Sequence, residues 1–305
     1  MKVIFDKELK GYAMLFDGPL DVVTHAKKAN SGANPFFAPE RQTWPGRRGE
    51  TWADFDRFLH SPWNEAVAKI DSIVNVVRKY VKPPTNIRRR LRWDETDGEV
   101  DIDRLLGGDP EFYRRPKRPR VHAPRNVALV ANLESGKGGR SVNPSGLWFR
   151  SGVAIAVADM LEDAGYSCEV WIWNLGYYLF PPPHHRCFVA WKAKAAGAVV
   201  DKHAMADSMS YWFTTQAVQA VPAANPVGIQ TTAAYPKGAA VEPNEGVTRV
   251  EDVGMGGWIK YLDIGDDVQK VAVPMVYSWS WDDPDSMPVQ TARAVLDEIV
   301  GVEGD

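Results

Sequence analysis

One stretch of the chain, residues 126–174, decides the expected fold and reads NVALVANLESGKGGRSVNPSGLWFRSGVAIAVADMLEDAGYSCEVWIWN. Its short apolar run at 127–130 is typical of a strand that is covered on both faces. A polar loop follows at 132–141, then a helical segment, and residues 168–173 supply a second strand. Such a βαβ unit places its first loop at the carboxyl edge of a parallel sheet, where folds of this kind bind ligands.

The helix between these strands has recognisable ends. Asn143 and Pro144 indicate its start, because asparagine is a good N-cap and proline fits the first helical position. We expect the helix from about Gly146 to Ala164, followed by Gly165 in a left-handed cap conformation.

Further strands and helices alternate along the chain. Strands are expected at 186–191 and 270–277, and helices at about 62–80, 204–221 and from Asp285 onward. Apolar stripes mark the first and last of these helices: Ala66, Ile70, Ile73, Val74 and Val77, and Val289, Ala292, Val295, Leu296 and Ile299. The sequence therefore predicts an α/β fold with a mainly parallel sheet, helices on both faces and right-handed crossovers.

Three regions are expected. Residues 1–85 form an N-terminal arm and helical region, in which we assign no strand, and residues 86–125 form a charged connector. Residues 126–305 form the α/β domain. The Pro-, Gly- and Asn-containing stretch 30–49 is interpreted as an irregular arm.

Composition narrows the classes of function. The 305 residues carry a net charge of -3, which argues against an overall polyanion-binding surface. No apolar run approaches the length of a bilayer span, and the N-terminus lacks a signal-peptide core. The two cysteines, Cys168 and Cys187, suit a reducing compartment as small buried hydrophobes. A cytoplasmic location without membrane association is expected.

The loop at 132–141 has one nucleotide-binding interpretation. Lys137 follows Gly136 as in a Walker A motif, but Ala131 stands at the first glycine position and Gly138 at the Ser/Thr position. The stretch also resembles the deviant P-loop of partition-type ATPases, although Arg140-Ser141 replaces the Gly-Lys-Thr end of that family. A degenerate nucleotide hydrolase is therefore an alternative function.

A second resemblance covers roughly residues 50–300. The strand, loop and helix of small and apolar residues, with the Ala-Gly-Tyr turn at 164–166, resemble a von Willebrand factor A-like domain. Segments 92–94 and 101–110, with Arg114-Arg115, are similar to uncharacterised proteins of this kind from phages and other mobile elements. In that family the first strand ends in D-x-S-x-S, whose oxygens ligate a divalent cation.

The metal motif of that family is degenerate in this chain. Asn132 stands at the Asp position, Glu134 and Gly136 at the Ser positions, and Ser135 is out of register. The resemblance therefore implies either no cofactor or Mg²⁺ at a weak site carried by Asn132, Glu134, Ser135 and Ser141. Of these two, a domain that binds partners without metal is favoured.

Partner recognition is expected at the loops of the carboxyl edge. The candidate residues are Lys137, Arg140, Asp201, Trp279, Trp281, Asp282 and Asp283. The same acidic residues would suit acid/base chemistry or cation binding, but turns and helix N-caps commonly carry such residues.

Two other constellations point to different chemistry. His184, His185 and Cys187 are zinc-ligand types that lack a second cluster, although Cys168 would approach them if their strands were neighbours. A basic block suits phosphate contacts through Arg114, Arg115, Lys117, Arg118 and Arg120. The acidic stretch 94–103 competes for those arginines, so a self-paired connector is favoured over nucleic-acid binding.

The leading hypothesis is a non-enzymatic protein-interaction module, an adapter or assembly protein encoded by a phage or mobile element. Its partner would be another protein, such as an AAA+ ATPase or a virion component, in the host cytoplasm. The nucleotide hydrolase and the nucleic-acid-associated protein remain the alternatives.

Overall fold

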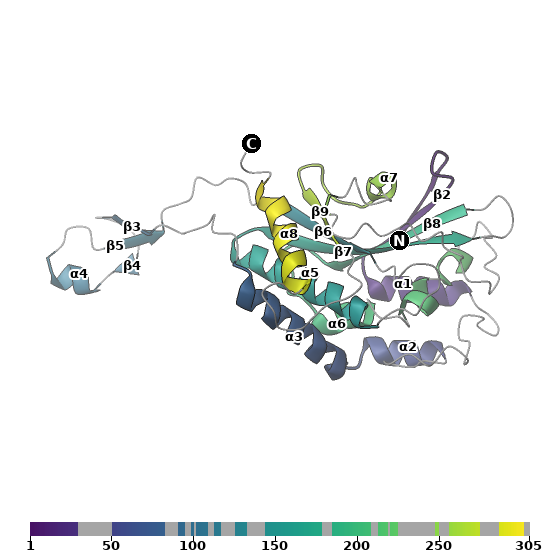
Figure 1. The fold of residues 1–305 in the computed structure, drawn as a ribbon, viewed down its shortest axis with the longest axis horizontal. Coiled ribbons are helices and arrows are strands. Elements are labelled where there is room, and N and C mark those ends of the chain that lie inside the picture. Colours follow the sequence, from purple (N-terminus) through teal and green to yellow (C-terminus); the bar gives the residue numbers. More distant parts are fainter. Residues whose placement is uncertain are drawn as a thin grey trace.

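The chain folds around a six-stranded sheet with the order β1-β2-β8-β7-β6-β9 (Figure 1). Its strands are β1 (Lys2–Asp6), β2 (Gly11–Phe16), β6 (Asn126–Asn132), β7 (Ser167–Tyr178), β8 (His185–Lys194) and β9 (Gln269–Val273). Three neighbouring pairs are parallel, β2–β8, β7–β6 and β6–β9, and two are antiparallel, β1–β2 and β7–β8. The protein is therefore a mixed α/β fold with a mostly parallel sheet.

This structure is a computed structural model, and it describes the chain in segments. They are residues 1–29, 51–82, 91–94, 99–100, 102–108, 113–116, 126–132, 144–178, 185–208, 213–218, 220–224, 248–249, 256–274 and 287–301.

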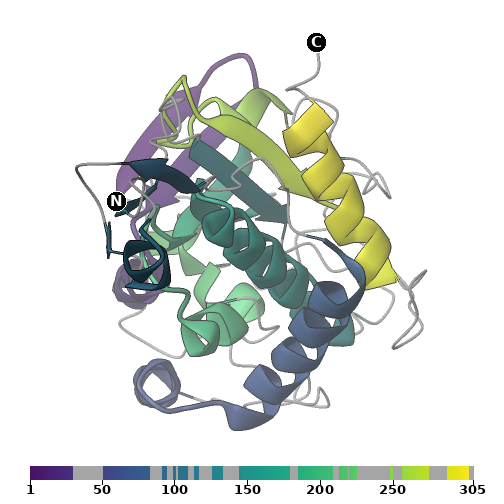
Figure 2. The ribbon, with the colours of Figure 1, turned by 90° about the vertical axis from the view of Figure 1, so that its left-hand side faces the viewer.

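Most of the described helices pack on one face of the sheet, which we call the helix side (Figures 1 and 2). They are α1 (Pro19–Ala26), η1 (Lys27–Ala29), α2 (Trp52–Leu59), α3 (Asn64–Tyr80), α5 (Pro144–Asp163), α6 (Lys202–Ser208), the π-helix η3 (Phe213–Val218), the 3-10 turn η4 (Pro222–Ala224) and α8 (Met287–Gly301). The helix α5 lies centrally between α3 and α8 and covers β6, as expected for the connection of a βαβ unit.

The apolar stripes predicted for the first and last helices are confirmed. All five stripe residues of α3 and all five of α8 are buried in the helix-side core. The helices α3 and α5 approach closely at Gly152, where a Cβ atom would lie 2.7 Å from Cβ and Cγ2 of Ile73. Glycine is needed there because the space of its side chain is already filled.

The predicted ends of the helix α5 are also confirmed. It begins at Pro144 and ends at Asp163, and Gly165 has a positive φ of 89°. The N–H of Gly165 donates to the Glu162 carbonyl, and the N–H of Tyr166 donates to the Leu161 carbonyl, both at 2.9 Å. This pattern is a Schellman cap, which satisfies the last carbonyl groups of a helix.

The sequence predicted helices on both faces of the sheet, but the face opposite the helix side is covered differently. Among the described residues, this face is covered by the one-turn helix α7 (Gly256–Ile259) and the residues that follow it, up to Ile264. Trp258 stacks on Phe188 of β8 with ring centroids 5.9 Å apart. Large aromatic rings fill this side, where three tryptophans, Trp171, Trp173 and Trp258, are at most 2% exposed. Trp191 of β8 is also fully buried, but in the helix-side core.

The N-terminal segment supplies two strands that the sequence analysis did not assign. The antiparallel hairpin β1–β2 joins the sheet through β2, which runs parallel to β8. Its turn is held by Asp6, whose carboxylate accepts hydrogen bonds from the backbone N–H groups of Glu8 and Leu9 at 2.7 and 2.9 Å. The same carboxylate accepts a hydrogen bond from the Tyr261 hydroxyl. These contacts tie the hairpin to the segment after α7.

The strand β8 is present where it was predicted, but its direction differs from a wholly parallel sheet. It pairs antiparallel with β7, from Val170 opposite Lys194 to Tyr178 opposite His185. The link between the two strands, residues 179–184, is too short for the crossover of a dozen or more residues that parallel neighbours need. An antiparallel pair is therefore the only arrangement that this link permits.

A separate three-stranded sheet has the order β3-β5-β4 and is drawn beside the main body in Figure 1. It comprises β3 (Leu91–Asp94), β4 (Glu99–Val100) and β5 (Tyr113–Pro116), together with the short helix α4 (Ile102–Leu106). These elements fall within the region that the sequence identified as a charged connector.

Candidate partner-binding edge

The carboxyl end of β6 is the point from which the predicted site is built. Asn132 is the last residue of this strand, and 9% of its surface is exposed. Its backbone carbonyl accepts a hydrogen bond from Nη1 of Arg150, a residue of α5 that is 2% exposed. A buried guanidinium on the helix therefore fixes the place where the chain leaves β6.

Arg150 was not singled out from the sequence. A signal for it exists, because it is a strong cation in a helix that otherwise presents mainly small and apolar residues to the core. Lys, Arg, Asp and Glu are almost never fully buried unless they are paired. A cation within such a helix, nearly two turns after its start, therefore indicates an acceptor nearby, and the carbonyl groups at the end of the preceding strand provide one.

Two of the predicted recognition loops leave the sheet at neighbouring points. The strands β6 and β9 are adjacent and parallel, with Val130 opposite Ala272 and Ala131 opposite Val273. Residues 133–143 follow β6 directly, and residues 275–286 follow Pro274 just after β9. Both segments lie outside the described residues, and with them the candidates Glu134, Ser135, Lys137, Arg140, Ser141, Trp279, Trp281, Asp282 and Asp283.

Asp201 occupies a different place from the one that a parallel sheet predicted. It follows β8, which runs opposite to β6 and β7, so this strand ends at the edge where β6 and β7 begin. Its carboxylate accepts hydrogen bonds from the backbone N–H groups of His203 and Ala204 at 2.9 and 3.0 Å. Asp201 is thus the N-cap of α6, the structural role that such a residue commonly has.

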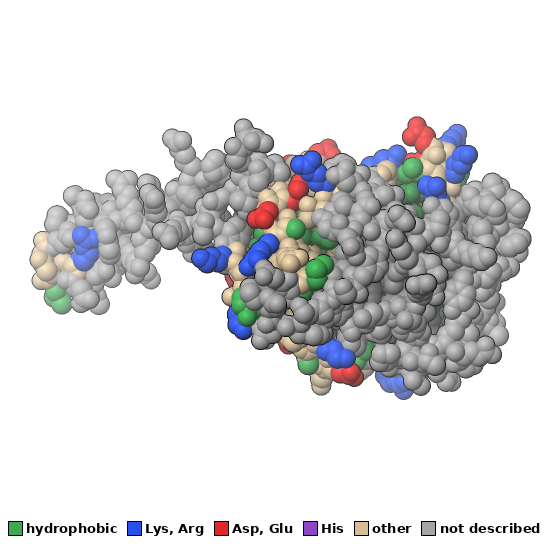
Figure 3. All heavy atoms as spheres, in the orientation of Figure 1, with side chains coloured by type: hydrophobic (Ala, Val, Ile, Leu, Met, Phe, Trp, Pro, Cys, Tyr) green, Lys and Arg blue, Asp and Glu red, His purple; other side chains and the backbone are tan. Residues whose placement is uncertain are grey.

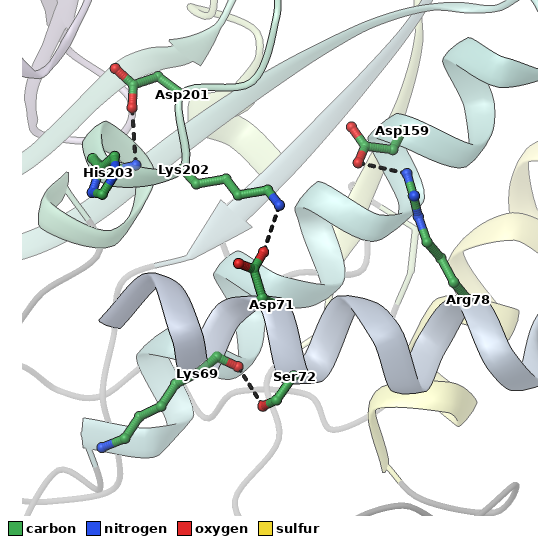
Figure 4. Close-up of polar contacts among 8 residues, drawn as sticks. All are labelled: Lys69, Asp71, Ser72, Arg78, Asp159, Asp201, Lys202 and His203. Atoms are coloured by element: carbon green, nitrogen blue, oxygen red, sulfur yellow. Dashed lines mark hydrogen bonds and ion pairs between the residues drawn. The ribbon is translucent and has the colours of Figure 1, made fainter. Parts of the chain in front are cut away.

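Ionic contacts around Asp201 join three helices on the helix side (Figure 4). Lys202 of α6 lies 2.5 Å from Asp71 of α3, and Arg78 of α3 lies 2.9 Å from Asp159 of α5. Burial raises the pKa of Asp159 above its usual range, although the charge of Arg78 opposes that shift. These side chains are partly exposed, so each pair contributes little to stability by itself and mainly fixes how the helices pack.

Of the zinc-ligand residue types, the two cysteines are not brought together, and His184 and the side chain of His185 lie outside what the structure describes. Both cysteines are buried, as expected, and Cys187 lies opposite Gly176 on β7, eight positions along that strand from Cys168. At about 3.3 Å per residue this separation is roughly 26 Å. Burial raises the pKa of the Cys168 thiol to about 12, so the thiolate that a metal needs is strongly disfavoured. Among the described residues, no three His, Cys, Asp or Glu side chains are placed to hold a metal ion.

The basic block is only partly described. Arg114 and Arg115 belong to β5, whereas Lys117, Arg118 and Arg120 lie outside the described residues. The strand register places Arg114 opposite both Trp93 and Glu99. The register therefore places an acidic position opposite a basic one, and the self-paired interpretation of this connector stays a prediction. On the face drawn in Figure 3, basic and acidic side chains of described residues are also interspersed.

Comparison with known proteins gives a family for the chain. The family described as "Domain of unknown function (DUF7192)" matches residues 6–278. The chain belongs to this family. The match runs from the end of β1 past β9, so the strands β2 to β9 of the main sheet and the small sheet all lie within it. No curated protein and no solved structure matched the chain.

None of the helices within the described segments is both long and apolar enough to cross a membrane. The longest apolar helix, α5, is instead buried between the sheet and two other helices.

Proposed function

We propose that this protein is a non-enzymatic protein-interaction module, an adapter or assembly protein encoded by a phage or mobile element. The domain is proposed to be von Willebrand factor A-like, and its binding surface is the carboxyl edge of β6 and β9. The proposed partner is another protein, an AAA+ ATPase or a virion component.

One observation carries this proposal. Because β6 and β9 are parallel neighbours, residues 133–143 and 275–286 start from adjacent points at one edge of the sheet. Together these segments contain basic residues, Lys137 and Arg140, aromatic residues, Trp279 and Trp281, and acidic residues, Asp282 and Asp283. Aromatic residues and arginine are the types that most often carry binding energy at protein interfaces.

The α/β core around α5 supports the resemblance in part. The block β7-β6-β9 is parallel, and the long helix α5 connects β6 to β7, as the resemblance implies. The chain departs from the sequence expectation at β8, which is antiparallel to β7, and in the placement of its long helices on one side. The proposal therefore rests on the edge formed by β6 and β9 more than on the resemblance.

The environment of Asn132 favours binding without a metal. The Arg150 guanidinium is bonded to the carbonyl of this residue, and a buried positive charge beside a proposed ligand opposes the approach of a divalent cation. The residues that would complete a metal site, Glu134, Ser135 and Ser141, include only one carboxylate. A weak Mg²⁺ site would have to overcome this repulsion.

The test is direct binding to the proteins encoded beside this one, with the AAA+ ATPase and virion proteins tested first. We expect the purified full-length chain to bind one of them, and Trp281→Ala with Arg140→Glu to weaken the complex at least tenfold. Lys82→Glu is the matched control, because Lys82 is exposed just beyond the end of α3 and belongs to neither edge segment. Binding that is equally strong in the edge variant and in the control would contradict the proposed surface.

A second measurement separates this function from catalysis. We expect the chain to release no phosphate from ATP with Mg²⁺, and we expect Mg²⁺ or Mn²⁺ to leave partner affinity unchanged. Hydrolysis that is lost in Lys137→Ala would replace the proposal with the nucleotide hydrolase. Affinity for DNA that falls steeply with salt and depends on Arg118 and Arg120 would favour the nucleic-acid alternative.

A further inference from the structure

The strand β1 forms the outer edge of the sheet, at the far end from the edge pair β6–β9. Among the described strands it pairs only with β2, so the backbone groups on its other side have no partner strand in the described part of the chain. An exposed edge of this kind is a ready template for a further strand. The residues of β1 indicate which strand would pair with it.

The two faces of β1 differ in a way that suits a second strand. Phe5 lies opposite Tyr12 with ring centroids 4.9 Å apart, and Tyr12 packs against the helix-side core. Val3 and Phe5 therefore share the helix side, where they are 37% and 46% exposed. Ile4 points to the other face and packs against the core cluster there. Two large apolar side chains thus remain half uncovered on one side of an edge strand.

We propose that β1 pairs antiparallel with β1 of a second copy of this chain, with the two-fold axis at Ile4. In this register Val3 faces the partner's Phe5 on the helix side, twice over by symmetry. Lys2 faces the partner's Asp6 on the other side. Apolar or aromatic pairs and opposite charges directly across two strands are both stabilising, so the segment is complementary to itself.

Neighbouring registers fit less well. Residues that face each other in an antiparallel pair lie on the same face of the sheet. A two-fold axis that relates two copies of β1 must therefore pass between the two copies of one residue, such as Ile4 and the partner's Ile4. An axis at Val3 would place Lys2 opposite Ile4, and an axis at Phe5 would place Ile4 opposite Asp6. Each of these registers pairs a charged residue with an apolar one. The axis at Ile4 instead pairs apolar residues with each other and a lysine with an aspartate.

The Asp6 carboxylate is held in place and ionised. The Tyr261 hydroxyl, the Leu9 N–H and Lys260 together lower the pKa of Asp6 well below its usual range. Lys260 also lies 2.9 Å from this carboxylate and neutralises part of its charge. The two Val3–Phe5 pairs therefore carry more of the affinity than the two Lys2–Asp6 pairs. Because the interface involves only one short strand from each copy, we expect a concentration-dependent dimer of micromolar order.

Sedimentation of the full-length chain over a range of concentrations tests the dimer. We expect reversible dimerisation, and we expect Phe5→Thr to raise the dimer Kd about tenfold, because two cross-strand pairs are lost. Threonine keeps a high strand propensity, so β1 itself should persist. Val199→Thr is the matched control, since Val199 is 93% exposed and lies outside the sheet. A monomer at all concentrations, or equal effects of the two substitutions, would overturn the proposal.

Disulfide trapping tests the register. In Ile4→Cys the new thiols of the two copies face each other, and mild oxidation should link the dimer covalently. In Lys2→Cys they stand four positions apart, about 13 Å, which is beyond the reach of a disulfide. The two native cysteines are buried and do not interfere. Linking through residue 2 but not residue 4, or through neither in a sample that dimerises, would refute this pairing.

Discussion

Replacement of Gly152 by alanine tests the packing of α3 on α5. Alanine favours a helix interior over glycine by about 1 kcal/mol, so local propensity alone predicts a more stable protein. The tertiary structure predicts the reverse. The added methyl group would lie 2.7 Å from Cβ and Cγ2 of Ile73, whereas carbon atoms pack at about 3.5–4.0 Å.

The two helices must therefore separate by roughly 1 Å at their closest point. Overpacking of this kind costs about 1–3 kcal/mol, and the Arg78–Asp159 contact on the same pair of helices would also be stretched. Subtracting the propensity gain of about 1 kcal/mol leaves a range of about 0–2 kcal/mol, and we expect Gly152→Ala to lower the free energy of unfolding by about 1 kcal/mol. Urea denaturation measures this difference directly.

Ser72→Ala is the control for helix propensity. Ser72 lies next to Ile73 in α3 but is exposed, and alanine there adds no atoms. It should be neutral or stabilising by a few tenths of a kcal/mol. If Gly152→Ala proves as stable as the wild type or more so, while Ser72→Ala behaves as expected, the close approach of α3 and α5 is wrong.

Three further predictions follow from buried polar groups. Lys194→Met should lower the free energy of unfolding, measured in urea, by about 2–4 kcal/mol, because the ammonium that bonds to Glu162 and to the Cys168 carbonyl is 1% exposed. Lys69→Met breaks an exposed ion pair and should lower it by under about 0.5 kcal/mol. Equal losses in the two variants would contradict this account. Burial lowers the pKa of His25, so the unfolded chain binds more protons than the folded chain in mildly acidic solution. The free energy of unfolding should therefore fall as the pH drops below about 6.5, and His25→Gln should remove that part of the pH dependence. An unchanged pH profile in the variant would exclude His25 as its source. Because burial raises the pKa of both thiols, neither cysteine should react with a thiol reagent at pH 8 until the protein is unfolded, and rapid labelling of the native chain would show that the core opens there.

Sequence periodicity determined the parts of the fold that depend on neighbours along the chain. The stripes of α3 and α8 repeat every three or four residues, and each buries its apolar face as expected. The start of α5 at Pro144 and its cap at Gly165 follow from the backbone preferences of proline and glycine. The buried strand β6 follows from its unbroken apolar run.

Other features had signals in the sequence that periodicity does not use. The β1–β2 hairpin consists of two apolar segments separated by four residues, a spacing typical of hairpins. The link between β7 and β8 is too short for a parallel crossover, which is enough to make that pair antiparallel. The direction of β8 in turn moves Asp201 away from the edge at which Asn132 lies. The direction of β8 was misjudged from the sequence, and Asp201 was therefore wrongly included among the residues of the candidate site.

What the sequence by itself determined is the apolar stripes of α3 and α8, the ends of α5 and the buried strand β6, because these depend on residues a few positions apart. Only the tertiary structure decided that β6 and β9 are neighbours, that Arg150 bonds to the end of β6, and that β1 is an edge strand. Each of these joins residues far apart in the chain. An apolar strand favours burial against any apolar neighbour, so its partner is chosen by the packing of the whole sheet and its helices.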